Sequence, residues 1–99
     1  MYALKVQIND EASVIAGADD LGVLNATVTC VGALGSSGHP GRADEFVDRF
    51  ITVGGLTARD SSAPNKHVKW MSQRPLRIGD LISIQILDTF NVEAPMYED

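Results

Sequence analysis

Hydrophobic and polar residues alternate most regularly in residues 75–87, PLRIGDLISIQIL. Ile82, Ile84 and Ile86 are separated by single polar residues, and an alternation with a period of two is typical of a β-strand with one buried face. The proline and the glycine–aspartate pair at positions 79–80 predict a turn just before this strand. We therefore expect a strand whose three isoleucines face the hydrophobic core.

The N-terminal residues 2–9 show the same alternation, because Leu4, Val6 and Ile8 are separated by lysine and glutamine. This pattern predicts a second half-buried strand. The Asn-Asp-Glu sequence that follows can reverse the chain direction, and residues 12–16 are a suitable hairpin partner for the first strand.

The middle of the chain contains two loops and a third strand-like stretch. Residues 46–53 have apolar anchors at Phe50, Ile51 and Val53, and a short helical turn over residues 43–47 is expected before them. The loops are predicted from glycine, serine and proline, which interrupt regular structure. They cover residues 35–45 and 57–66.

Residues 23–34 fit two secondary structures. A helix would place Leu24, Val28 and Val31 in one apolar stripe, but the many β-branched residues lower helix propensity and suit a pleated surface. We favour a strand, with a helix as the alternative. In the strand, Cys30 lies on the apolar face and is expected to be a buried small hydrophobic residue.

Residues 66–72 are predicted to form the one short helix of the chain. Asn65 can cap its N-terminus, and Val68 and Met71 are spaced three apart as on one side of a helix. Trp70 is expected to cover the core with its large apolar ring.

These elements predict a mainly β fold, namely a small antiparallel β-sandwich or a partly open barrel with one short helix. If residues 23–34 are helical instead, an α+β roll is the alternative. The length of 99 residues suits one domain. We assign residues 1–88 to a single β-rich domain and residues 89–99 to an acidic C-terminal tail.

Charge is distributed unevenly along the chain. The net charge is −5, and a negative protein repels a phosphate backbone, so nucleic acid is an unfavoured partner. The single cysteine suits a reducing compartment, and we expect a cytoplasmic protein. No stretch is long and apolar enough to predict a membrane span, and the N-terminus lacks the pattern of a signal peptide.

Motifs for catalysis or metal binding are weak throughout. His39, His67 and Cys30 lack the close pairing typical of zinc ligands, and no Gly-x-Ser-x-Gly sequence supports a nucleophile. Asp80 is interpreted as a turn residue whose carboxylate accepts local N–H groups. We expect no catalytic residue, no metal and no cofactor.

The strongest candidate for an interaction surface is a basic segment that contains a tryptophan. Basic residues near an aromatic ring can bind single-stranded nucleic acid or an acidic protein surface. The alternative is a tryptophan that faces the core among solvated basic residues. The candidate residues are Lys66, Lys69, Trp70, Arg74 and Arg77.

Several short motifs together resemble a family of small bacterial β-rich proteins of unassigned function. The motifs are residues 22–26 (GVLNA), 53–56 (VGGL), Trp70 and 75–80 (PLRIGD). The resemblance implies a bacterial, cytosolic, single-domain protein, and it implies no catalytic or ligand-binding residue.

The sequence therefore favours a non-enzymatic protein-binding module. One version is an inhibitor or immunity-type protein that covers a basic surface of its partner with its acidic residues. The alternative is a small-ligand or nucleic-acid-binding β-barrel that uses the basic segment around Trp70. Exposed edge strands in so small a sheet also make a homodimer a reasonable expectation.

Overall fold

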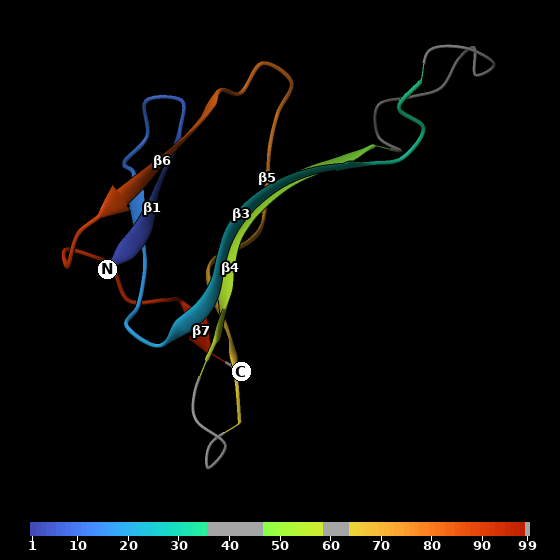
Figure 1. Ribbon diagram of the computed structural model, residues 1–99. Coiled ribbons are helices and arrows are strands. Elements are labelled where there is room, and N and C mark those ends of the chain that lie inside the picture. Colours follow the sequence, from blue (N-terminus) through green and yellow to red (C-terminus); the bar gives the residue numbers. More distant parts are fainter. Residues whose placement is uncertain (36–46, 59–63, 99) are drawn as a thin grey trace.

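The fold was established from a computed structural model that describes residues 1–35, 47–58 and 64–98 (Figure 1). Seven strands occur in this part of the chain, and their order follows the sequence. They are β1 (Tyr2–Ile8), β2 (Val14–Ala16), β3 (Leu21–Val31), β4 (Asp48–Thr57), β5 (His67–Pro75), β6 (Ile82–Asp88) and β7 (Tyr97–Glu98).

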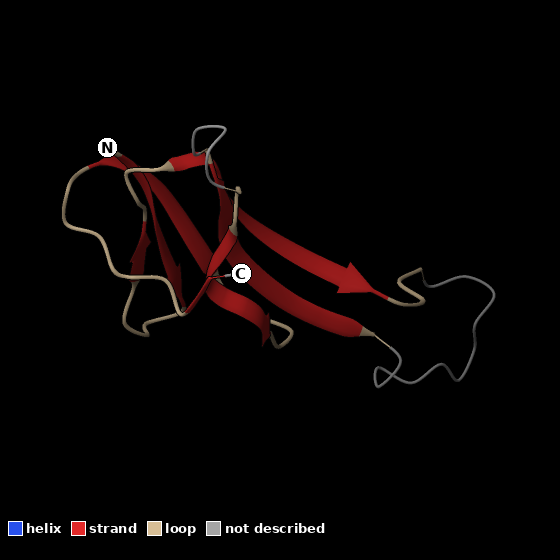
Figure 2. Ribbon diagram, turned by 90° about the horizontal axis from the view of Figure 1, so that it is seen from below, coloured by secondary structure: helices blue, strands red, loops and turns tan. Residues whose placement is uncertain are grey.

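The strands form two antiparallel sheets that pack against each other as a small β-sandwich. One sheet has the order β2-β1-β6 and the other has the order β3-β4-β5-β7. We call them the three-stranded and the four-stranded sheet. The regular elements of the described residues are all strands (Figure 2). The predicted mainly β sandwich is therefore confirmed, and neither sheet closes into a barrel.

The three-stranded sheet agrees with the predicted hairpin. β1 pairs with β2 through Leu4 and Ala16, and it pairs on its other side with β6 through Val6 and Ile84. Asn9 turns the chain after β1 with a φ of 54°, a conformation that asparagine tolerates better than most residues. The N- and C-terminal thirds of the domain thus meet in one sheet.

The predicted helix over residues 66–72 is wrong, because residues 67–72 belong to β5. β5 pairs with β4, and the register shifts on both sides of Val53. Each shift gives β5 one extra residue, which is a β-bulge. The bulge between Lys69 and Met71 lets Val68, Trp70 and Met71 all take buried positions, with exposed fractions of 5%, 2% and 8%. The resulting three-residue spacing resembled a helical stripe.

The ambiguous residues 23–34 are confirmed as a strand over most of their length, because β3 covers Leu21–Val31. The expected burial of Cys30 is wrong, since this cysteine is exposed. Val28, on the same face of the strand, is 48% exposed. β3 is the outer strand of its sheet, and its far end extends with β4 away from the rest of the sandwich (Figure 1).

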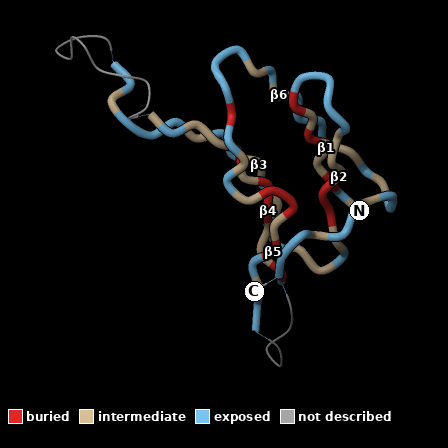
Figure 3. Tube along the Cα trace, turned by 180° about the vertical axis from the view of Figure 1, so that it is seen from behind, coloured by how far each residue is buried: buried red, intermediate tan, exposed pale blue. Residues whose placement is uncertain are grey.

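The core lies between β1 and the middle of the four-stranded sheet (Figure 3). Val6, Ile51 and Val53 are completely buried there. The expectation that Ile84 and Ile86 are buried is wrong, because they are 47% and 75% exposed. Their direction is as predicted, since they pair with the core-facing Val6 and Leu4. β6 is an outer strand, and of its three isoleucines only Ile82 packs against the core.

The segment predicted as an acidic tail packs on the sandwich over its described part. Met96 donates its backbone N–H to the carbonyl of Lys69 at 2.8 Å. β7 then pairs with β5, and the carboxylate of Glu98 lies 3.8 Å from the ammonium of Lys66. The segment after Asp88 therefore adds an outer strand to the four-stranded sheet.

The two predicted loops and the helical turn over residues 43–47 fall largely outside the described residues, as does His39. The described part is nevertheless elongated. The radius of gyration is 16.4 Å, whereas a compact domain of about 100 residues has a value of about 13 Å. A structure with this shape exposes more of its apolar residues than a compact one.

Gly55 sets the spacing between β3 and β4. A Cβ atom added to Gly55 would lie 2.4 Å from the carbonyl oxygen of Val23, whereas one added to Gly35 would have no neighbour within 4 Å. We predict that Gly55→Ala lowers the free energy of unfolding by about 2 kcal/mol, because the two strands must separate. Gly35→Ala should change it by less than about 0.5 kcal/mol. Urea denaturation of both variants tests this prediction, and equal midpoints would contradict it.

Candidate interaction surface

The residues of the predicted basic segment do not form one surface. Lys66 and Lys69 lie near the start of β5, whereas Arg74 and Arg77 lie at its end and in the turn that follows. The five positions from Lys69 to Arg74 correspond to about 17 Å of extended chain. Their charges therefore act at separate places on the sandwich.

Trp70 is not accessible to a ligand. Its side chain is 2% exposed, and the indole N–H donates to the carbonyl oxygen of Glu93 at 2.8 Å. A base or aromatic ligand can stack only on an exposed ring. Trp70 therefore covers the core, as one of the two interpretations predicted.

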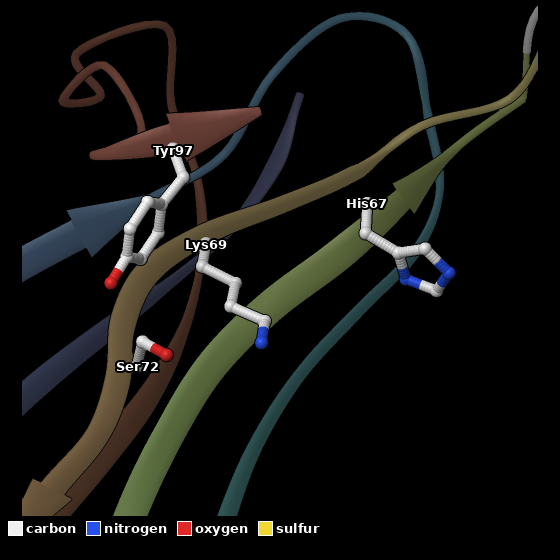
Figure 4. Close-up of a pocket in the computed structure, with 4 residues that line it drawn as sticks. All are labelled: His67, Lys69, Ser72 and Tyr97. Atoms are coloured by element: carbon white, nitrogen blue, oxygen red, sulfur yellow. The ribbon is translucent and has the colours of Figure 1, made fainter. Parts of the chain in front are cut away.

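The start of β5 lines a small depression on the outer face of the four-stranded sheet. Its lining residues are His67, Lys69, Ser72 and Tyr97, and the imidazole of His67 lies apart from the other three (Figure 4). The depression has a volume of about 120 Å³, and sites for small organic ligands usually measure about 300–1,000 Å³. These four side chains do not define a ligand pocket.

The end of β5 is engaged in contacts within the chain. The guanidinium of Arg74 forms a salt bridge with the carboxylate of Glu11. This contact joins the turn between β1 and β2 to the end of β5. The basic charge of Arg74 therefore has an internal partner.

Asp80 has the local role that the sequence predicts. Its carboxylate accepts the backbone N–H of Arg77 at 2.7 Å and the side-chain amide of Asn9 at 2.9 Å. These two bonds, with a smaller contribution from the charges of Arg77 and Arg74, hold the pKa of Asp80 below its usual value of 3.8. Gly79 completes the turn with a φ of 93°, which suits glycine.

The described residues contain no group of three or more histidine, cysteine, aspartate or glutamate side chains that could hold a metal ion. Cys30 is an exposed thiol, and His67 lies on the outer face of β5. Asp80 bonds to Arg77 and Asn9 rather than to a histidine. Cys30, His67 and Asp80 therefore do not form one group of neighbouring side chains.

The structure does have one side of the sandwich on which no described segment bridges the two sheets. The opposite side is closed by Glu93, which exchanges hydrogen bonds with the backbone of Ile15 in β2 and accepts the indole N–H of Trp70 in β5. Because β2 and β5 are joined there, β6 and β3 are the outer strands on the other side, and β3 contacts β1 of the three-stranded sheet. We call this the open side.

The open side is apolar and has unpaired strand edges. Ile86 is 75% exposed although it shares the core-facing surface of its sheet, and Tyr2 next to it is 78% exposed. β6 and β3 each have a strand on one side only among the described residues. Sequence reasoning missed this surface, although the absence of charge from residues 21–34 could have indicated it.

Comparisons with known proteins do not add a function. No family model, no curated protein and no solved structure matches the chain. Within the described ranges, no helix is long and apolar enough to cross a membrane. The candidate surface therefore depends on the geometry of this chain alone.

The hydrogen bonds of Asp80 predict a dependence of stability on pH. A lowered pKa means that the folded chain favours the charged carboxylate over the protonated one. The carboxylate therefore contributes fully to the stability of the fold above the ordinary pKa of 3.8. This stabilisation is lost as the pH falls through the lower pKa of the folded protein. We predict that Asp80→Asn melts at a lower temperature than the wild type at neutral pH. The difference should shrink in acid.

Thermal melting monitored by circular dichroism at neutral pH and near pH 3 measures this difference. Asp19→Asn is the matched control, because Asp19 is an exposed aspartate in the loop between β2 and β3. It should melt close to the wild type at neutral pH. A deficit for Asp80→Asn that is the same at both pH values would refute the role of the carboxylate charge.

Proposed function

We propose that the protein is a non-enzymatic protein-binding module and that its partner contacts the open side of the sandwich. The observation that carries the proposal is the exposure of Ile86 on the core-facing surface of β6. An isoleucine at such a position is normally covered by the opposite sheet. A protein partner that covers it would supply the missing apolar contact.

The composition of the two outer strands also supports a protein partner. Outer strands usually carry lysine, proline or bulges that block pairing with another chain. β6 has a single charged residue, Asp88 at its last position, and β3 has none, with a bulge only at its start between Leu21 and Val23. The backbone groups along the free edges of β3 and β6 can therefore pair with a strand of a partner, and the exposed isoleucines of β6 can pack against its apolar side chains.

The open side also modifies the expected chemistry of the partner. Glu11 is one of the acidic residues that an inhibitor-type contact would use, but its carboxylate is already paired with Arg74 within the chain. The proposed surface is apolar, so the partner should present apolar side chains rather than a mainly basic surface. We retain a cytoplasmic location as part of the proposal, supported by the single unpaired cysteine.

A substitution at Ile86 tests the proposal. Tagged wild-type protein should capture a defined protein from an extract of its native host, with untagged copies of the chain included in the extract. Ile86→Ser should reduce that capture by about tenfold, because the partner loses a central apolar contact. The free energy of unfolding should change by less than about 1 kcal/mol, since the side chain is exposed.

Ile78→Ser is the matched control, because Ile78 is also 75% exposed but lies in the turn between β5 and β6. This variant should capture as much partner as the wild type. Failure of the wild type to capture any protein, at both low and moderate salt, would overturn the proposed function. If both isoleucine variants lose capture equally, the effect is not specific to β6, and this outcome would contradict the placement of the partner on that strand.

A further inference from the structure

β3 has the features of a strand that is paired on both edges, although the chain pairs only one of them. It is 11 residues long, it contains neither charge nor proline, and its neighbour among the described strands is β4. A long uncharged edge readily pairs with another chain. Its exposed apolar residues include Val23 and Val31, which are 49% and 52% exposed.

The outward face of β3 reads nearly the same in both directions. Its residues are Val23, Asn25, Thr27, Thr29 and Val31. In an antiparallel pair of identical strands, a two-fold axis at the central residue places position 23 opposite position 31 and position 25 opposite position 29. Valine then faces valine, asparagine faces threonine, and Thr27 faces its own copy.

The core-facing side of β3 tolerates the same arrangement. With the axis at Thr27, Ala26 lies opposite Val28 of the second copy, and Leu24 lies opposite Cys30. All four are apolar or only weakly polar. Neither face would bring two charges together, so the pairing carries no electrostatic cost.

We propose that β3 pairs antiparallel with β3 of a second copy of this chain, across a two-fold axis near Thr27. This inference rests on the proposed function, because it names the protein that the open side binds. The pairing joins two four-stranded sheets into one continuous sheet. Every backbone N–H and C=O group along the shared edge then has a partner.

The same axis accounts for the exposed isoleucines of β6. A two-fold axis between antiparallel strands is perpendicular to the sheet, so both three-stranded sheets lie on one face of the joined sheet. β6 is the strand nearest to the axis in each copy, because β6 and β3 share the open side. Ile84 and Ile86 therefore lie at the interface between the copies.

β6 is a weaker candidate for the pairing strand itself. It has seven residues, and its outward face carries Ser83, Gln85 and Leu87, which do not repeat when the direction is reversed. Self-pairing of β6 would place leucine opposite serine. The more symmetric and longer edge is that of β3.

Charged residues at Thr27 test the inference with the full chain. Sedimentation velocity should give the wild type a mass of twice 10.6 kDa. Thr27→Lys and Thr27→Glu should each raise the dimer dissociation constant by about tenfold or more, because two like charges would face each other across the axis. Mixing the two variants at low ionic strength should restore a dimer, since opposite charges would then face each other.

His67→Lys serves as the control, because it adds a positive charge to the outer face of the same sheet but on β5. It should remain a dimer with the affinity of the wild type. Circular dichroism of each Thr27 variant should match the wild type, which is expected for an exposed residue. A dimer that persists in both Thr27 variants, or a mixture that stays monomeric, would overturn the β3 pairing.

The outcome for the wild type separates this inference from the proposed function. A wild-type chain that sediments as a monomer at all micromolar concentrations overturns the second-copy inference. If Ile86-dependent capture of a different protein is retained in that case, the protein-binding function stands with another partner. If that capture is also absent, both proposals fail.

Discussion

Glu93 makes the contact on which the arrangement of the two sheets depends. Its backbone N–H donates to the carbonyl of Ile15, its carboxylate accepts the N–H of the same residue, and its carbonyl accepts the indole N–H of Trp70. These bonds hold β2 of one sheet beside β5 of the other. The sandwich is consequently closed along one side, and the strands farthest from Glu93, β6 and β3, form the side that remains open.

The alternation of apolar and polar residues predicted most strands, but it could not predict how far each apolar face is covered. Period two reports which way a side chain points, and Ile84 and Ile86 do point toward the core side of their sheet. Their exposure depends on whether a strand of the other sheet lies opposite, which is a property of the sheet order. The same reason accounts for Cys30, which is on the expected face near the uncovered end of β3.

The error at β5 has a different physical origin. Val68 and Met71 are both buried because one bulge inserts an extra residue between them, and a bulge is defined by the pairing with a neighbouring strand. The sequence of one strand does not contain that information. By contrast, the bond from the backbone N–H of Arg77 to Asp80 was predictable, since the two residues are three positions apart. The second bond of Asp80, from Asn9 in the turn after β1, is non-local and was not predicted. Local hydrogen bonding can be read from sequence, whereas non-local register cannot.

The candidate interaction surface also depended on non-local structure that the sequence does not contain. Basic residues that are close in sequence were separated along β5, and Trp70 between them faces the core. The apolar open side, in turn, is made of β3 and β6, which lie far apart in the sequence, so the uncharged residues 21–34 could indicate only one of its two strands. A short chain has few ways to stabilise an elongated sandwich, because its core is small. Burial of an uncharged edge and two exposed isoleucines against a second copy would add apolar contact and backbone hydrogen bonds at once, which makes self-association the simplest account of why β3 lacks the charges that usually protect such an edge.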